Sequence, residues 1–167
     1  AELYAGSQHD LGVVAGGFAY GGLDAIGHLD LYGGDRVLSL RVLVDTVAGE
    51  LDQIPFVSLP TLGGDTLRGY WSSRFRDRWS AAASLEYTWP VTRGLAAFAF
   101  ADAGRVARTA AALVDDPLRA GGGLGLQVHG QRALGARMWL AVSREGAIVA
   151  NLKLDTSFAS RPREVPR

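Results

Sequence analysis

The sequence predicts an all-β protein: a transmembrane antiparallel β-barrel segment of about eight strands, with one long loop folded inward. Three observations predict this fold. First, apolar and polar residues alternate strictly along several segments of the chain, so that each segment has one aliphatic and one polar face. Second, no apolar run approaches the roughly 18 residues of a membrane helix; residues 95–101 form the longest obvious one. Third, residues 48–78 form a loop of about 30 residues, which is unusual in a compact soluble domain and expected on the extracellular side of an outer-membrane barrel.

Composition excludes several classes of protein and site. The chain has 167 residues, which fits one domain, and a formal net charge of +0. Because phosphate binding needs a basic surplus, we expect no nucleic-acid partner. The absence of cysteine excludes disulfides and thiolate metal sites. His9, His28 and His129 are scattered without metal-ligand spacing, so neither a metal nor a cofactor is predicted.

Three strands are expected before the long loop. Residues 11–22 are predicted to form a glycine-rich strand and residues 26–32 a second one. The sequence Gly-Gly-Asp at 33–35 then indicates a hairpin turn. In the third strand, residues 36–47, the even positions from 38 to 44 are aliphatic and the odd positions are mostly polar. Such a strand needs an apolar medium on one side and water on the other.

About five strands are expected after the loop, over residues 80–91, 95–106, 123–129, 137–145 and 148–158. A loop with a short helix is expected at 107–119. Alternation places one set of side chains toward lipid: Leu85, Tyr87, Leu126, Leu140, Leu152 and Leu154. It places a second set toward the lumen: Glu86, Asp102, Gln127, Asn151 and Lys153.

Three charged residues indicate how the loop is held. Glu86 and Asp102 each lie in an otherwise apolar strand, where a lone carboxylate is costly unless it meets a cation. Arg68 in the loop carries a planar guanidinium with five donors, which could serve both carboxylates. Gly69 would allow a tight turn, and Tyr70 would pack as an apolar body with a polar tip. We therefore expect the loop to enter the barrel and to place Arg68 on both carboxylates.

These residues also carry a family resemblance. The segment LGGDTLRGY, the strand SLEYTWPV and the FxDxG pattern of Phe100, Asp102 and Gly104 resemble the barrel domain of the BamA/TamA-type outer-membrane assembly family, the bacterial surface antigens. In that family the RGY or RGF tip belongs to the long sixth extracellular loop, and its arginine contacts acidic residues on the next strands. The resemblance covers roughly residues 26–158. It implies a protein of the bacterial outer membrane that inserts or translocates other proteins, and not an enzyme.

The resemblance also implies that this chain is the C-terminal half of a barrel, since family barrels have sixteen strands. Residues 1–158 would be the barrel segment, and residues 159–167, rich in proline and arginine, a disordered tail. The last strand resembles the family's C-terminal targeting strand and would form one side of the barrel seam through Ile148, Leu152, Leu154 and Phe158. The expected partners are outer-membrane lipids, substrate β-barrel proteins or a passenger, the missing N-terminal half-barrel and possible periplasmic domains.

Two alternatives stay open at this point. Eight strands can close alone as a small barrel that acts as a lipid-modifying enzyme or a porin-like structural protein, although its narrow lumen hardly fits so long a loop. Ser84 or Ser143 could be nominated as the nucleophile, but neither has a histidine nearby in sequence and no G-x-S-x-G motif is present. A soluble lipocalin-like carrier would instead place its aliphatic face inward.

Overall fold

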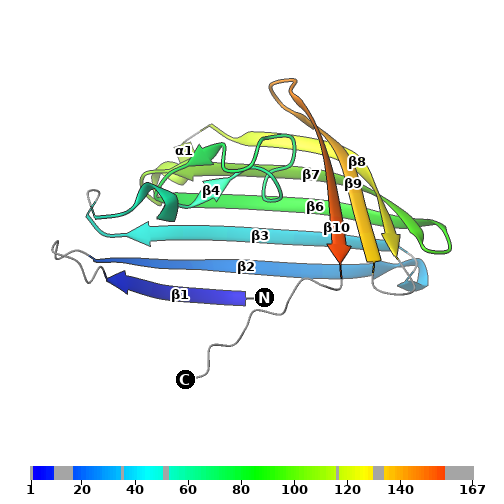
Figure 1. Cartoon of the computed structure of the whole chain (residues 1–167), viewed down its shortest axis with the longest axis horizontal. Helices are drawn as coiled ribbons and strands as arrows, with labels where there is room; N and C mark the ends of the chain where they lie inside the picture. The colour runs from blue at the N-terminus through cyan, green and yellow to red at the C-terminus, as the bar shows by residue number, and fades with distance from the viewer. Residues whose placement is uncertain are drawn as a thin grey trace.

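The computed structural model describes residues 2–9, 17–34, 36–50, 53–115, 117–129 and 134–156. These residues form an eight-stranded antiparallel sheet in the order β1-β2-β3-β6-β7-β8-β9-β10 (Figure 1). Each strand thus pairs with its neighbours in sequence, and β3 pairs with β6 across the long loop. The predicted all-β, antiparallel fold class is confirmed.

The strands of this sheet are β1 (Glu2–His9), β2 (Gly17–Leu31), β3 (Arg36–Ala48), β6 (Trp79–Thr92), β7 (Leu95–Ala107), β8 (Arg119–His129), β9 (Leu134–Ser143) and β10 (Ile148–Thr156). The long loop contains a two-stranded sheet of its own, β4 (Thr61–Leu62) and β5 (Phe75–Arg76), and the 3-10 turn η2 (Phe56–Ser58). The turn η1 (Tyr32–Gly34) joins β2 to β3, and the short helix α1 (Ala112–Asp115) lies between β7 and β8.

The predicted boundaries of the first two strands were wrong. Residues 17–31 form one continuous strand, β2, and a separate strand, β1, precedes it. The glycine pair within β2 does not break it, because the ladder continues on both sides: Gly22 is opposite Tyr4 on β1 and Asp45 on β3. Residues 11–16 lie outside the described residues. The glycine turn after β2 is confirmed, and Gly33 has the positive φ of 79° that favours this residue type.

The later elements agree with the sequence pattern more closely. The third strand and those after the loop occur where they were expected, and the short helix is α1. Three limits differ by more than one residue: β8 starts at Arg119, so the run of three glycines belongs to the strand, and β9 starts at Leu134 and ends at Ser143, so Glu145 lies in the following turn. Residues 157–167, with Phe158 and the predicted tail, lie outside the described residues.

The long loop lies on one face of the sheet. Buried Leu62, Leu67 and Tyr70 of the loop pack against Leu43 of β3 and Ala82 of β6. We call this the loop face and the opposite one the outer face. Packing of three large side chains on the sheet explains why a segment of this length does not project into solvent.

The two faces differ in polarity as the alternation predicted. Large apolar side chains are exposed on the outer face of β3, β6, β8, β9 and β10, among them Leu40, Val42, Leu85, Leu124, Leu126, Met138, Leu140, Leu152 and Leu154. The loop face carries Glu86, Asp102 and Lys153. An apolar surface this extensive indicates a partner surface or a membrane.

Glycines on the loop face of β8 permit close packing within the sheet. A Cβ atom on Gly123 would lie 2.7 Å from Cζ of Phe100, and one on Gly125 would lie 2.2 Å from Cζ of Phe98. Both phenylalanines are buried with Trp139 of β9. The backbone of β8 thus approaches the rings of β7 as only glycine allows, and Figure 1 shows β9 and β10 turning steeply relative to β6.

The ends of the sheet also differ. The long loop and the α1 segment lie at one end, and the short turns after β2 and β6 lie at the other. Within the described residues the sheet is not closed: β1 pairs with β2 only, and β10 with β9 only. No helix of the described residues is long and apolar enough to cross a membrane.

Candidate functional site

A tight turn at Gly69 delivers Arg68 to the sheet. The φ angle of Gly69 is 97°, and a Cβ atom there would lie 3.1 Å from the backbone nitrogen of Ser143 on β9. Next to it, buried Tyr70 donates a hydrogen bond from its hydroxyl to the carbonyl of Ala120, at 3.1 Å. The RGY sequence therefore combines a left-handed glycine with an aromatic anchor, and both hold the arginine in place.

Asp102 binds Arg68 through three hydrogen bonds. Nε of Arg68 donates to Oδ2 at 2.8 Å and Nη2 donates to Oδ1 at 2.8 Å, which is the bidentate geometry of the guanidinium and carboxylate groups. The backbone N–H of Arg68 donates to Oδ2 as well, at 2.9 Å. Asp102 is 2% exposed and Arg68 is 7% exposed, so the pair is shielded from water.

Two residues of β6 complete the coordination of the guanidinium. Nη1 of Arg68 donates to Oε2 of Glu86 at 2.6 Å, and Nη2 donates to the hydroxyl of Ser84 at 2.7 Å. Ser84 in turn donates to Oδ1 of Asp102 at 2.6 Å. The structure thus brings Arg68, Glu86 and Asp102 together as the sequence predicted.

The guanidinium also stacks on an aromatic ring. Cζ of Arg68 lies 3.6 Å from the ring centroid of Phe100. The aromatic ring therefore contacts the face of the planar guanidinium, while the hydrogen-bond acceptors contact its N–H groups. Burial alone would lower the pKa of Arg68, but the hydrogen bonds and negative charges of Asp102 and Glu86 outweigh it and raise the pKa above its ordinary value. Arg68 is therefore present as a cation.

The FxDxG pattern has a physical role at each position. Phe100 provides the ring, Asp102 the carboxylate, and Gly104 the space for the loop. A Cβ atom on Gly104 would lie 2.9 Å from Cδ1 of Leu62 and 3.0 Å from the carbonyl oxygen of Ala81. One strand thus supplies three successive loop-face contacts to the same loop.

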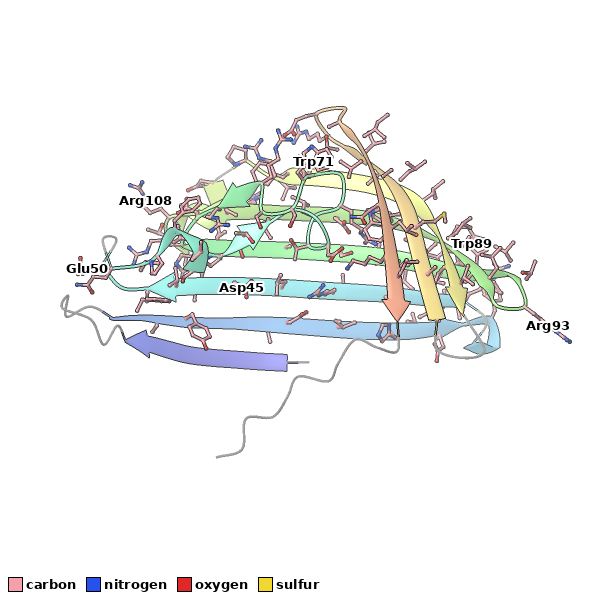
Figure 2. All side chains as sticks on the ribbon, viewed as in Figure 1. Asp45, Glu50, Trp71, Trp89, Arg93 and Arg108 are labelled. Carbon is pink, nitrogen blue, oxygen red and sulfur yellow. The ribbon has the colours of Figure 1, made fainter. Side chains whose placement is uncertain are left out.

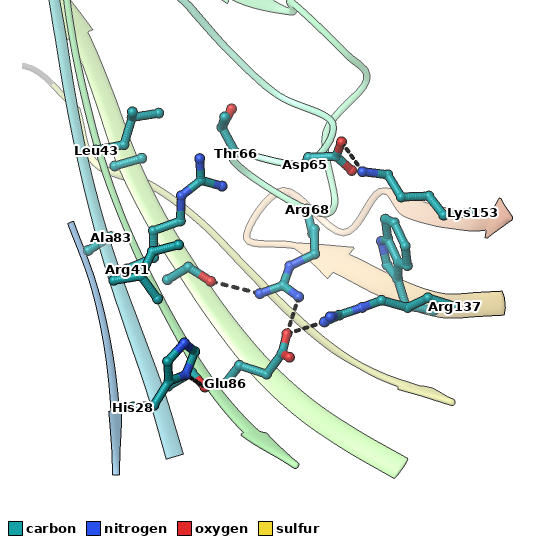
Figure 3. Close-up of a pocket in the computed structure, with 15 residues that line it drawn as sticks. His28, Arg41, Leu43, Asp65, Thr66, Arg68, Ala83, Glu86, Arg137 and Lys153 are labelled. Atoms are coloured by element: carbon teal, nitrogen blue, oxygen red, sulfur yellow. Dashed lines mark hydrogen bonds and ion pairs between the residues drawn. The ribbon is translucent and has the colours of Figure 1, made fainter. Parts of the chain in front are cut away.

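Arg68, Ser84, Glu86 and Asp102 are termed the Arg68 cluster. Arg137 of β9 extends it and was not predicted from the sequence. Its Nη2 donates to Oε2 of Glu86, and its Cζ lies 4.0 Å from the ring centroid of Phe98 (Figure 3). Glu86 therefore joins two arginines from the loop and from β9. Arg137 could have been found by the rule that selected the carboxylates, because it too is a charge on the polar face of a largely apolar strand.

A second ion pair links the loop to the last described strand. Lys153 of β10 contacts Asp65 of the loop, and both side chains are about half exposed (Figure 3). Between this pair and the Arg68 cluster lies a cavity of about 290 Å³, whose lining includes His28 and Arg41. The loop therefore contacts strands of both the middle and the end of the sheet.

The other residues selected from the sequence lie apart from the cluster. Ile148, Leu152 and Leu154 are exposed, and Leu152 and Leu154 lie on the outer face of the edge strand β10. The hydroxyl of Ser143 accepts a hydrogen bond from the backbone N–H of Ala147 in the turn before β10. Within the described ranges no group of three or more His, Cys, Asp or Glu residues is arranged to hold a metal ion.

The arrangement of the Arg68 cluster holds a loop against a sheet. Arg68, Ser84, Glu86 and Asp102 satisfy one another through six hydrogen bonds of 2.6 to 2.9 Å. Comparison with protein-family models found no match, and comparison with curated proteins found none either.

Proposed function

We propose that this chain is the C-terminal half of a sixteen-stranded outer-membrane barrel of the BamA/TamA type, which inserts or translocates other proteins. The observation that carries the proposal is the coordination of Arg68, from an RGY turn, by Asp102 of an FxDxG strand and by Glu86 of the preceding strand. The family resemblance implies a contact of the same kind, between the loop arginine and acidic residues of the next strands.

The layout of the strands supports the same proposal. Three strands of the sheet precede the loop and five follow it, as the sixth loop of the family requires. The two longest connections of the described sheet, the long loop and the α1 segment, lie at the same end, as the long connections of outer-membrane barrels do. The outer face is aliphatic over β6 to β10, which suits contact with lipid.

In the proposed activity, the edge strand β10 pairs with a strand of the protein that is being inserted. The free edge of β10 carries backbone N–H and C=O groups that can pair with an incoming strand. In the proposed barrel this edge meets the first strand of the missing half, and the two can part. The Arg68 cluster would keep β6, β7 and β9 fixed while the edge is exchanged.

Photocrosslinking in the full-length protein tests this function. A photoreactive amino acid at Leu154, on edge strand β10, should capture a substrate β-strand during insertion. The matched control is Leu85. This residue is also a leucine exposed on the outer face, but it lies on β6, which is paired on both sides within the sheet. Capture at both positions, or at neither while substrate is being inserted, contradicts the proposal.

A further inference from the structure

The edge strand β10 carries a cation on the loop face, and this cation has a like charge beside it. Lys153 is directly opposite Arg137 of β9 in the ladder (Figure 3). Like charges that face each other across two strands destabilise the pairing, so each of them needs an acidic partner from another segment. Arg137 has Glu86 of β6, and Lys153 has Asp65 of the loop.

These two acidic partners differ in how firmly they are held. Glu86 is bound by Arg68 as well as by Arg137, and its side chain is 15% exposed. Asp65 and Lys153 are each about half exposed, and they are 88 residues apart in sequence. Because water weakens an exposed ion pair, Asp65 is the partner that another carboxylate can replace.

The side of Lys153 away from Arg137 faces the open edge of the sheet. Among the described strands, β10 pairs with β9 only. A strand added at this edge places one residue directly opposite Lys153, with the two Cβ atoms about 4.5–5.5 Å apart. A glutamate or aspartate at that position can reach the ammonium group of Lys153 from the edge, as Asp65 reaches it from the loop.

The alternation of side chains determines which set of residues in the added strand faces Lys153. Its neighbours on β10, Leu152 and Leu154, are exposed on the outer face. A strand whose apolar residues share that face presents every second residue to the loop face. The residue opposite Lys153 therefore belongs to the polar set of the added strand, as Glu86 belongs to the polar set of β6.

We propose that the strand received by β10 carries an acidic side chain opposite Lys153, and that its carboxylate takes the place of Asp65. The proposal rests on the proposed function, which makes β10 the receiving edge, and it specifies the chemistry of the substrate strand. Because Lys153 and Arg137 are adjacent in the ladder, a carboxylate is favoured at this position and a lysine or arginine is disfavoured. Once Lys153 has changed partner, this ion pair no longer ties the loop to β10, and Arg68 still holds the loop on β6 and β7.

Three synthetic peptides test the charge preference. In each, valine alternates with glutamate, glutamine or lysine over about ten positions, so every register that keeps valine on the outer face presents the same residue to Lys153. The full-length protein, in detergent micelles, carries a photoreactive amino acid at Leu154. Capture of the glutamate peptide should exceed capture of the glutamine peptide by about two- to fivefold, the range of a cross-strand charge pair, and the lysine peptide should be captured least.

Three variants separate the effect of Lys153 from a general effect of charge. Lys153→Glu should reverse the order of the peptides. Arg93→Glu changes the net charge equally in the turn between β6 and β7, where Arg93 points away from the sheet (Figure 2), and it should keep the wild-type order. Asp65→Asn removes the competing carboxylate, so it should increase capture of the glutamate peptide and leave capture of the glutamine peptide unchanged.

The proposal would be overturned by equal capture of the three peptides, by capture of none, or by an unchanged order in Lys153→Glu. An equal gain for all peptides in Asp65→Asn, a reversed order in Arg93→Glu, or crosslinks between two copies of the protein in place of peptide capture would also overturn it. Capture of a substrate protein at Leu154 tests the proposed function separately. Substrate capture without a charge order among the peptides refutes only the acidic partner of Lys153, and a charge order without substrate capture refutes only the assembly function.

Discussion

Asp102 receives two kinds of hydrogen bond from residue 68, and only one depends on the arginine side chain. The guanidinium donates through Nε and Nη2, while the third bond comes from the backbone N–H. Replacing Arg68 therefore leaves one of these bonds possible, whereas replacing Asp102 removes all three. Asp102 thus holds the backbone of the loop as well as the arginine side chain, while the guanidinium alone binds Glu86 and Ser84.

This asymmetry predicts the order of effects in variants. Arg68→Ala should release the loop in part, Arg68→Lys should rescue it poorly because the planar guanidinium is lost, and Asp102→Ala should release it further. Removing one partner of a buried pair costs about 3–5 kcal/mol, a figure that a water-filled lumen would reduce. The measurement is trypsin cleavage at exposed Arg74 in the loop. Equal cleavage in wild type and all three variants would refute the proposed role of the contact.

Gly121 provides a second test at the level of one residue. A Cβ atom there would lie 2.2 Å from the carbonyl oxygen of Arg68, so Gly121→Ala must displace the loop backbone. Overpacking of this kind costs about 1–3 kcal/mol. Gly27→Ala in β2 is the control, since no atom lies within 4 Å of its added Cβ. We expect a lower urea midpoint for Gly121→Ala alone, and a similar change in both variants would contradict the close approach.

The central residues of the cluster could be predicted from the cost of a lone charge in an apolar strand. That rule identifies Glu86 and Asp102, and the donor geometry of arginine identifies their partner. The contact between Glu86 and Arg137 was not predicted, because β7 and β8 separate β6 from β9 in the sheet. Such a contact depends on how strongly the sheet curves, and alternation along single strands does not contain this information.

Two of the contacts that attach the loop to the sheet are ion pairs, and these differ in strength. Arg68 is buried among its partners, whereas Asp65 and Lys153 are half exposed. Exposed pairs contribute about 0.2–1 kcal/mol and weaken as salt rises. The attachment to β10 is therefore the weaker one, and the loop can leave the edge strand while it stays bound to β6 and β7.

A charge reversal tests this second attachment. Asp65→Lys should increase loop mobility near β10, and the double variant Asp65→Lys with Lys153→Asp should restore the wild-type state. The measurement is the distance between spin labels on the loop and on β10, at about 0.1 M and 1 M salt, where the Debye length falls from about 10 to 3 Å. If the double variant behaves like the single one, the two residues do not interact in solution.

Elements with clear alternation were predicted more accurately than those rich in glycine. β3, β6 and β7 have regular patterns, and their limits agree with the structure to within one residue. β8 was expected to begin at 123, because its first glycines lack the side chains from which alternation is read. What surrounds these glycines belongs to other segments: a Cβ atom on Gly121 would lie 2.2 Å from the carbonyl oxygen of Arg68, and one on Gly122 would lie 3.2 Å from the carbonyl oxygen of Phe100.

For the whole molecule, chemical labelling can test whether the outer face of the sheet contacts lipid and the loop face contacts water. Single cysteines at Leu85, Leu126 and Leu140 should react with a membrane-soluble probe in reconstituted full-length protein, because these positions are on the outer face. Cysteines at Gln127 and Asn151 should react only with a water-soluble probe, because neighbouring positions alternate between faces. Mixed reactivity within either set would exclude a membrane-spanning barrel.

The unpaired edges of β1 and β10 predict how this segment behaves alone. A hydrocarbon interior does not tolerate open edges, so residues 1–158 should aggregate in detergent unless the other half of the barrel is supplied. Electrophoresis with and without heating measures this outcome. A heat-modifiable, monomeric band from residues 1–158 alone would instead favour the small closed barrel.

The two attachments of the loop also differ in when each can form. Arg68 binds partners 18 and 34 residues away, whereas Arg137 is 51 residues from Glu86 and Lys153 is 88 residues from Asp65. Closing a short stretch of chain costs less entropy than closing a long one, so contacts that are near in sequence tend to form early. We therefore expect the loop to dock on β6 and β7 while β9 and β10 are still unfolded, and β10, the edge proposed to receive other strands, to be the last of these strands to reach its place.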